Sequence, residues 1–399
     1  MRLSFLFLFA GALPVGAAAQ PRAPSRADSL LVGRILLAED RRDSTDAALA
    51  RGRTHPDARI RVITARALGR IRDPKFAARD SLPPLPSPPA WPEPAWRLRY
   101  RALAARRTDC AALGAALADS AWPVRLRAAD LLPAACGSDE AIVATLRRWI
   151  DELPADASRR RAGEVSWHAA AHAMPALARL RPGDARERLP RLARHAQWQV
   201  RLYAARAAAV LADTVRLRAA ARDPNDNVKE AAVDALSKAV GHAADDVYLE
   251  VLRARGAQAV RAAALALVGS PRPDARRVAA AIFERWVPRG SASELDARVA
   301  LLQAAGRLAS DDRPPRAPAL LPSDAVALAL GRDVRVRVTM DSSAGGGSFV
   351  VRLRGDVAPV TGGRILALVR RGYYDGLTWH RVEPDFVIQG GSADDNEYV

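Results

Sequence analysis

Apolar residues recur at three- and four-residue spacing from residue 28 to about residue 310, which is the period of amphipathic helices. One short pattern returns along this stretch: a turn marked by Trp, Pro or a polar residue, then Val or Ile followed by Arg or Lys, then an alanine-rich run. Copies are centred on Ile60-Arg61, Val124-Arg125, Val200-Arg201, Val228-Lys229 and Val260-Arg261. Copies spaced by about 30 residues, with helical period inside each, are typical of helix pairs stacked in a solenoid. We therefore predict a helical repeat array over residues 28–312.

The repeated units resemble HEAT repeats. A solenoid of such units offers a long surface that suits protein binding, and the repeats carry no catalytic motif. The stretch 81–96 is rich in proline, which predicts an insertion in polyproline II conformation rather than helix. A docking ligand for a partner is the alternative interpretation of this insertion.

The hydrophobic period changes after a proline-rich linker at residues 313–322. Val334 to Val338 alternates with the period of two that predicts a β-strand, and Phe349 to Leu353 predicts a second strand after a glycine turn. Ala358-Pro359 then predicts the start of a helix from about Val360 to Arg371. A second domain, built differently from the array, is expected here.

The run that follows this helix carries the candidate chemistry. It reads Gly372-Tyr-Tyr-Asp-Gly, then Trp379-His380-Arg381, then Phe386 and Gln389-Gly390-Gly391. This order resembles the first half of a cyclophilin-type peptidyl-prolyl cis-trans isomerase. The resemblance covers residues 334–399 and implies a fold class of α-solenoid followed by a partial, truncated cyclophilin-like β-barrel.

By the same resemblance, two residues are expected to be catalytic and two to bind substrate. Arg381 would donate a hydrogen bond to the prolyl nitrogen, and Gln389 would hydrogen-bond the substrate backbone or orient Arg381. Phe386 would form the apolar floor under the proline ring, with His380 as a hydrogen-bonding residue beside the site. Rotation about an amide breaks no σ bond, so neither a metal nor an organic cofactor is expected.

The resemblance also predicts what this segment lacks. Strands that stop at Val399 leave unpaired sheet edges, and the second half of the proline pocket of the family is absent. We expect a fragment of a longer gene product, with little or no isomerase activity in the chain as given. Trp379 and Arg364-Ile365 depart from the residues usual in the family and affect packing. The rival interpretation is a non-catalytic HEAT-repeat scaffold with an inactive cyclophilin remnant.

The charge of the chain raises a further alternative. It has 61 Lys and Arg against 44 Asp and Glu, a net charge of +17, which would suit a nucleic-acid partner if the charge were concentrated. The arginines are instead spread along the chain, which favours solvated helix faces. Proline-containing client proteins or peptides are the expected partners, and nucleic acid is not.

The N-terminus predicts an export signal over residues 1–19. Met1-Arg2 is followed by an apolar stretch to Val15, with small residues Ala17-Ala18-Ala19 before Gln20, the pattern of a cleaved signal peptide. The mature protein is expected to be periplasmic or secreted, without stable membrane insertion. A retained anchor is the alternative, although the apolar stretch is shorter than a bilayer span.

Cysteine and histidine give two further candidates. Cys110 and Cys136 lie about one repeat apart, and in an exported chain a disulfide between them and two free thiols are both open. His168 and His172 are four residues apart but have no glutamate after the first histidine and no third ligand nearby. Ordinary helix histidines are therefore favoured over metal ligands.

Overall fold

A computed structural model describes residues 23–72, 94–155, 167–254, 256–286, 292–307, 323–341, 346–379, 381–383 and 387–391. Contacts group the described residues into two compact units. One unit joins residues before 88 to residues 317–375, and the other joins residues 88–316 to those after 375. The predicted signal peptide, most of the proline-rich insertion and the linker lie outside the described residues.

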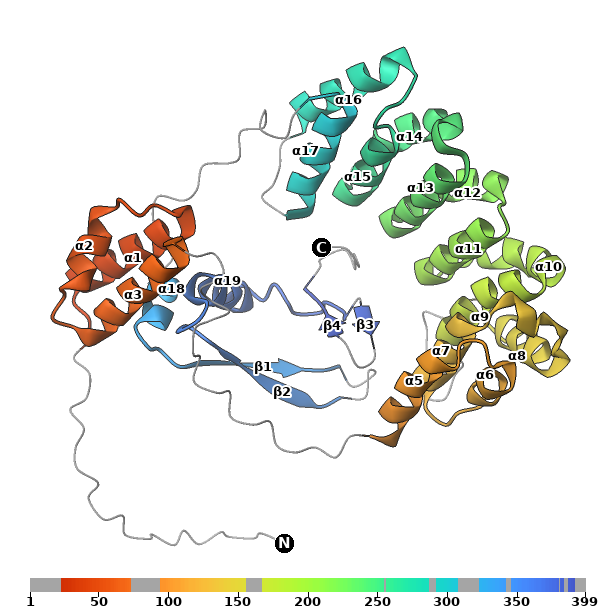
Figure 1. The fold of residues 1–399 in the computed structure, drawn as a ribbon, viewed down its shortest axis with the longest axis horizontal. Coiled ribbons are helices and arrows are strands. Elements are labelled where there is room, and N and C mark those ends of the chain that lie inside the picture. Colours follow the sequence, from red (N-terminus) through yellow and green to blue (C-terminus); the bar gives the residue numbers. More distant parts are fainter. Residues whose placement is uncertain are drawn as a thin grey trace, which may run out of the picture. The chain divides into compact units, whose positions relative to one another are not determined.

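The helical array consists of paired helices in two rows (Figure 1). The inner row comprises α5 (Ala95–Ala105), α7 (Trp122–Leu131), α9 (Trp167–Leu180), α11 (Trp198–Val210), α13 (Asp226–Val240), α15 (Ala257–Ala266) and α17 (Ala292–Ala304). The outer row comprises α6 (Cys110–Ala116), α8 (Glu140–Asp151), α10 (Pro182–Leu192), α12 (Thr214–Ala220), α14 (Asp245–Val251) and α16 (Pro273–Arg285), with short 3-10 turns η1 (Ala134–Ser138) and η2 (Gly241–Ala244). The predicted α-solenoid is confirmed.

Alanine lets neighbouring inner helices pack closely. In α9, Ala170 and Ala173 are fully buried beside Leu177, and in α11 Ala204 and Ala207 are buried in the same cluster. Small side chains shorten the distance between helix axes, so each helix pair completes its core on the next pair. The core of the array is therefore one continuous cluster to which helices of both rows contribute.

The arginine of the repeated Val-Arg pattern has a structural role. Nη1 of Arg125 donates to the carbonyl oxygens of Asp119 and Ser120 at 2.7 and 3.1 Å. Nη1 of Arg201 donates to the carbonyls of His195 and Ala196 at 2.8 and 2.9 Å. In both copies the guanidinium donates to two carbonyl oxygens in the turn that precedes its own helix. Within the described residues these oxygens accept no backbone hydrogen bond, so the arginine satisfies them.

Cys110 and Cys136 form a disulfide, which settles the alternative left open by the sequence. Their Cα atoms are 5.4 Å apart, within the range that a disulfide spans. The bond joins the first residue of α6 to η1. It therefore links two consecutive repeats of the array.

The first three helices of the chain belong to the other unit. These helices are α1 (Arg26–Arg41), α2 (Ala47–Arg53) and α3 (Ala58–Arg72), and they share a core with α18 (Ser323–Ala329). Leu31, Val32 and Ile35 of α1 pack in one buried cluster with Val326 and Leu330. The contacts thus group residues 26–72 with the C-terminal segment, whereas the sequence pattern placed them in the array.

Two arginines of α3 extend this contact to the turn before the C-terminal helix. Arg66 Nη1 donates to the Asp356 carbonyl at 2.7 Å, and Arg70 Nη1 donates to the Val357 carbonyl at 2.9 Å. Glu39 of α1 pairs with both guanidinium groups, at 3.2 and 2.8 Å. One carboxylate therefore orients both arginines toward the same turn.

The C-terminal elements agree closely with the prediction. Strands β1 (Val334–Thr339) and β2 (Ser348–Leu353) form an antiparallel sheet in which Val336 lies opposite Val351. Helix α19 (Pro359–Arg370) follows, and strands β3 (Arg381–Glu383) and β4 (Val387–Gln389) form a second sheet. Within the described residues these are two separate two-stranded sheets, consistent with a partial cyclophilin domain rather than a closed barrel.

Two boundaries differ from the sequence prediction. Helix α5 begins at Ala95, after Pro94 at its N-cap, so the proline-rich insertion does not extend to Trp96. The helix propensity of the alanine- and leucine-containing run outweighs the prolines that precede it. Helix α18 occupies residues that the sequence analysis left unassigned between the linker and β1.

Candidate functional site

The hairpin of β3 and β4 brings the two predicted catalytic residues together. In its antiparallel register Arg381 lies directly opposite Gln389, and Val382 lies opposite Ile388. Side chains of directly opposed residues project from the same face of a sheet, with Cβ atoms about 5 Å apart. The guanidinium and the carboxamide therefore share one face, and Val382 and Ile388 share the other.

The two faces differ in exposure. Arg381 and Gln389 are half-buried, whereas Val382 and Ile388 are 48% and 55% exposed. The guanidinium is planar and holds its N–H donors in a fixed geometry. The polar face can thus present a hydrogen-bond donor in a defined direction.

An aromatic side chain supports the end of this hairpin. A Cβ atom on Gly390 would lie 2.7 Å from Cε3 of Trp379, so the indole ring packs directly on the backbone beside Gln389. Gly391 has a φ of +100°, a conformation that residues with side chains rarely adopt. The local structure therefore favours glycine at both positions of the motif: at Gly390 because of the contact with Trp379, and at Gly391 because of its backbone conformation.

The Gly-Tyr-Tyr-Asp turn ends helix α19. Gly372 has a φ of +66°, and the Tyr373 amide donates to the Leu368 carbonyl at 3.1 Å, as in a helix C-cap with a left-handed glycine. The rings of Tyr373 and Tyr374 pack edge to face with centroids 5.2 Å apart. Burial raises the pKa of the Tyr374 hydroxyl, so the hydroxyl stays protonated.

The remaining predicted site residues lie outside the described residues. These are His380 and Phe386. The structure thus brings Arg381 and Gln389 together and leaves the roles of all four residues as predictions.

The histidine pair of the array is engaged in local contacts. His172 Nδ1 lies 2.8 Å from Asp130 Oδ1, and its Nε2 lies 2.9 Å from the Tyr203 hydroxyl. His168 stacks on Trp167 with ring centroids 3.7 Å apart. Both nitrogens of His172 are thus hydrogen-bonded, and no cluster of three metal-ligating side chains occurs in the described part of the chain.

Among the described residues, no helix is both long enough and apolar enough to span a membrane.

One feature of the array was missed by the sequence analysis. A pocket of about 250 Å³ lies between α10, α11 and α12, lined by alanines and by Arg194, Arg201 and Arg216. Arginines occur throughout the sequence, so no local motif distinguishes those that line a cavity. Only their position in three dimensions reveals them.

Comparison with known proteins identifies the C-terminal segment. Residues 335–398 match the family model of the cyclophilin type peptidyl-prolyl cis-trans isomerase/CLD. Peptidyl-prolyl cis-trans isomerase-like 1 of Rhizopus delemar is 46% identical over 57 residues, which are 14% of this chain and 33% of that protein. Peptidyl-prolyl cis-trans isomerase cyp18 of Streptomyces antibioticus is 45% identical over 53 residues, 13% of this chain and 32% of that protein.

The complex of CpcE and CpcF of phycocyanin lyase from Nostoc sp. PCC7120 aligns over 74% of this chain and 91% of that chain, with 15% identity and a TM-score of 0.28. The chain spans about a third of the length of the curated relatives above. This protein carries, in residues 335–398, a segment of the cyclophilin-type peptidyl-prolyl cis-trans isomerase family, joined to a mostly helical region.

Proposed function

We propose that this protein accelerates prolyl isomerisation in exported client proteins, with the helical array as the surface that binds those clients. The observation that supports the catalytic part is the register of β3 and β4, in which Arg381 and Gln389 are cross-strand partners. The family match over residues 335–398 supports the reaction class.

The chemistry of the reaction explains the residue types. An X-Pro amide isomerises slowly because rotation must overcome a barrier of about 20 kcal/mol that arises from C–N resonance. At the twisted transition state the prolyl nitrogen becomes pyramidal and gains a lone pair. A guanidinium that donates to this lone pair stabilises the twisted geometry more than the planar amide, which is the condition for catalysis.

Arg381 is assigned this donor role, and Gln389 holds the substrate backbone or orients the guanidinium. Phe386 supplies the apolar floor for the proline ring, and His380 is a hydrogen-bonding residue beside the site. No step of this mechanism requires a general base, because no proton is transferred.

A protease-coupled prolyl isomerisation assay on the full-length protein tests the catalytic proposal. We expect Arg381→Ala to lower kcat/KM about a hundredfold, the loss typical of removing one transition-state hydrogen-bond donor. Arg371→Ala is the matched control, because Arg371 is an exposed arginine at the end of α19. Equal rates for the unaltered protein and Arg381→Ala would favour the non-catalytic scaffold instead.

Export is proposed on the N-terminal sequence and is supported by the disulfide between Cys110 and Cys136, because such bonds persist in oxidising compartments. We expect the mature protein in the periplasmic or secreted fraction, with its N-terminus at Gln20. N-terminal sequencing of fractionated protein and alkylation without reductant test this. Recovery in the cytoplasm with both thiols alkylated would contradict it.

A further inference from the structure

Ion pairs connect neighbouring helices of the outer row at two junctions. At the first junction, Arg147 of α8 donates through Nε to Asp184 of α10 at 2.8 Å. Arg188 of α10 pairs with Asp151 of α8 at 3.0 Å in a two-point contact. Each helix thus contributes one cation and one anion to this junction.

The junction between α12 and α14 is closed by the same kind of contact. Arg218 pairs with Asp246 at 2.8 Å, and Arg222 pairs with Glu250 at 2.6 Å. In both junctions an aspartate in the first turn of the later helix forms an ion pair with an arginine of the earlier helix. A negative charge at this place also suits the positive end of the helix dipole.

At the junction between α10 and α12, the first turn of the later helix carries a positive charge instead of a negative one. Arg216 stands third in α12, the position that Asp184 holds in α10. Among the described residues no ion pair joins α10 to α12. The acid that bridges the neighbouring junctions is therefore missing at this one.

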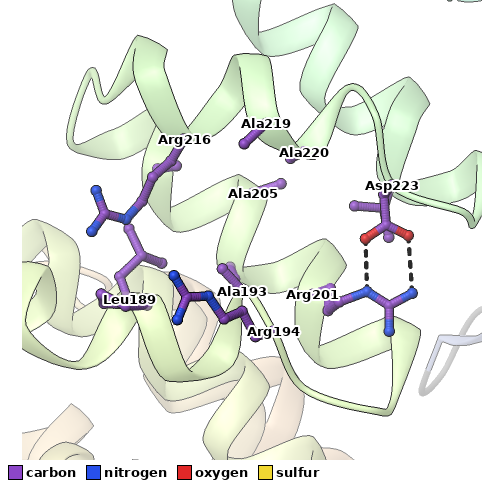
Figure 2. A pocket seen from close by; sticks show the side chains of 13 residues that line it. Leu189, Ala193, Arg194, Arg201, Ala205, Arg216, Ala219, Ala220 and Asp223 are labelled. Atoms are coloured by element: carbon purple, nitrogen blue, oxygen red, sulfur yellow. Dashed lines mark hydrogen bonds and ion pairs between the residues drawn. The ribbon is translucent and has the colours of Figure 1, made fainter.

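A pocket of about 250 Å³ opens at this junction. Its lining is mainly apolar and small, with alanines from α11 and α12 and the exposed Ala193 after α10. Figure 2 shows the guanidinium groups of Arg194 and Arg216 on the same side of the pocket as Leu189, with Arg201 and Asp223 on the opposite side.

The charges that line the pocket do not balance. Three arginines and one aspartate line it. Arg201 and Asp223 neutralise each other through contacts of 2.7 and 2.9 Å. Arg216 pairs with Asp213 at 2.8 Å, and Arg194 has no side-chain ion pair within the part of the chain that the structure describes.

We propose that this pocket binds an acidic segment of a client protein, with an aspartate or glutamate carboxylate between Arg194 and Arg216. The carboxylate takes the place of the acid that the neighbouring junctions supply from the array itself. An apolar side chain next to it fills the space above the alanines, because small lining residues leave room for a larger one. The proposal rests on the proposed role of the array as the client-binding surface.

Fluorescence anisotropy with the full chain tests this binding. The probe is a short fluorescein-labelled peptide rich in glutamate, alanine and leucine, and the control peptide carries glutamine in place of every glutamate. We expect the glutamine peptide to bind about tenfold more weakly, as for the loss of one charge-assisted hydrogen-bonded contact. Equal affinity of the two peptides would overturn the proposal.

Three variants locate the site. Arg216→Glu restores the acid of the neighbouring junctions, and we expect it to weaken glutamate-peptide binding about tenfold or more. Ala219→Leu fills the exposed edge of the pocket without a change of charge and is expected to weaken binding as well. Arg186→Glu is the matched control, since Arg186 is exposed on α10 but does not line the pocket. If Arg186→Glu and Arg216→Glu weaken peptide binding equally, the effect comes from the net charge of the protein, and the proposed site is refuted.

Two further readouts separate this proposal from its alternatives. A DNA oligonucleotide that displaces the peptide and itself loses binding in Arg216→Glu would assign the pocket to nucleic acid. Isomerase activity of the full-length protein on a short proline peptide without acidic residues reports on the site of Arg381 and not on the pocket. Peptide binding without isomerase activity would therefore refute the catalytic proposal only, and isomerase activity without peptide binding would refute the pocket proposal only.

Discussion

Glu230 is a buried acid in the middle of the array, between α13 and α15. It is only 5% exposed, and its carboxylate accepts hydrogen bonds from Gln258 and Arg261. Burial raises the pKa of Glu230, and burial likewise raises the pKa of Asp234 one turn away. At the residue scale, the array therefore contains carboxyl groups that are more readily protonated in the folded state than in the unfolded state.

The sign of the resulting pH dependence follows from linkage. A carboxyl with a raised folded pKa binds more protons when folded, so its contribution to stability is present at low pH and is lost as pH rises through the folded pKa. We expect Glu230→Gln to reduce the fall in melting temperature between the ordinary pKa of glutamate, 4.5, and neutral pH. Glutamine retains an oxygen that accepts from Gln258.

Thermal melts at several pH values provide the measurement, with Glu187→Gln as control because the side chain of Glu187 is 77% exposed. Identical pH profiles for Glu230→Gln and the unaltered protein would show that this carboxyl does not couple folding to pH.

At the scale of elements, α18 packs closely against α19 at Gly363, where α19 has no side chain. A Cβ atom on Gly363 of α19 would lie 2.8 Å from the backbone nitrogen of Ala325 and 3.0 Å from its Cα. Backbone atoms cannot move aside as a flexible side chain can. The two helices can therefore approach this closely only where α19 has no side chain.

Gly363→Ala should consequently destabilise the unit that contains α18 and α19. We expect a loss of about 1–3 kcal/mol, because overpacking outweighs the better helix propensity of alanine. Urea unfolding monitored by circular dichroism measures the loss. The matched control is Gly183→Ala, since a Cβ on Gly183 meets nothing within 4 Å; a stabilised Gly363→Ala protein would contradict the close contact.

Much of this level of structure could be predicted from sequence. The alternation from Val334 and the Ala358-Pro359 start gave β1 and α19 nearly to the residue, because both signals are local. Helix α18 is short, and its partners are distant in sequence. Its packing against α1 therefore could not be predicted from a local pattern.

The candidate site shows the same division. The family resemblance predicted Arg381 and Gln389 as site residues. Their cross-strand pairing was not predicted and is seen only in the register of β3 and β4. Arg194 and Arg216 have no motif, and their relation to each other arises from the stacking of α10 on α11 and α12. Such a site depends on the repeat geometry and could not be predicted from composition.

At the scale of the whole molecule, the chain forms two units that are each built from discontinuous segments. Each has its own buried cluster, one along the array and one around α1 and α18. The disulfide between Cys110 and Cys136 lies in the array. Separate cores of this kind are expected to unfold in separate transitions.

Calorimetry of the full chain should therefore resolve two transitions. Reduction of the disulfide should lower only the transition of the array, by the equivalent of about 3–4 kcal/mol for a bond between residues 26 positions apart. Gly363→Ala should lower only the other transition. A single transition that responds to both changes would show that the units unfold together.

The contact between Arg66 and the Asp356 carbonyl joins residues 290 positions apart in the sequence. This separation along the chain has a consequence for biosynthesis. Helices α1 to α3 are synthesised before the array, whereas Val326 and Leu330, which complete the cluster around Leu31 and Ile35, are made only after it. During that interval the repeats of the array can fold one after another. The apolar cluster of α1 to α3 meanwhile lacks Val326 and Leu330 and stays partly exposed to solvent. Helices α1 to α3 are therefore expected to need a chaperone until residues 323–330 have been synthesised.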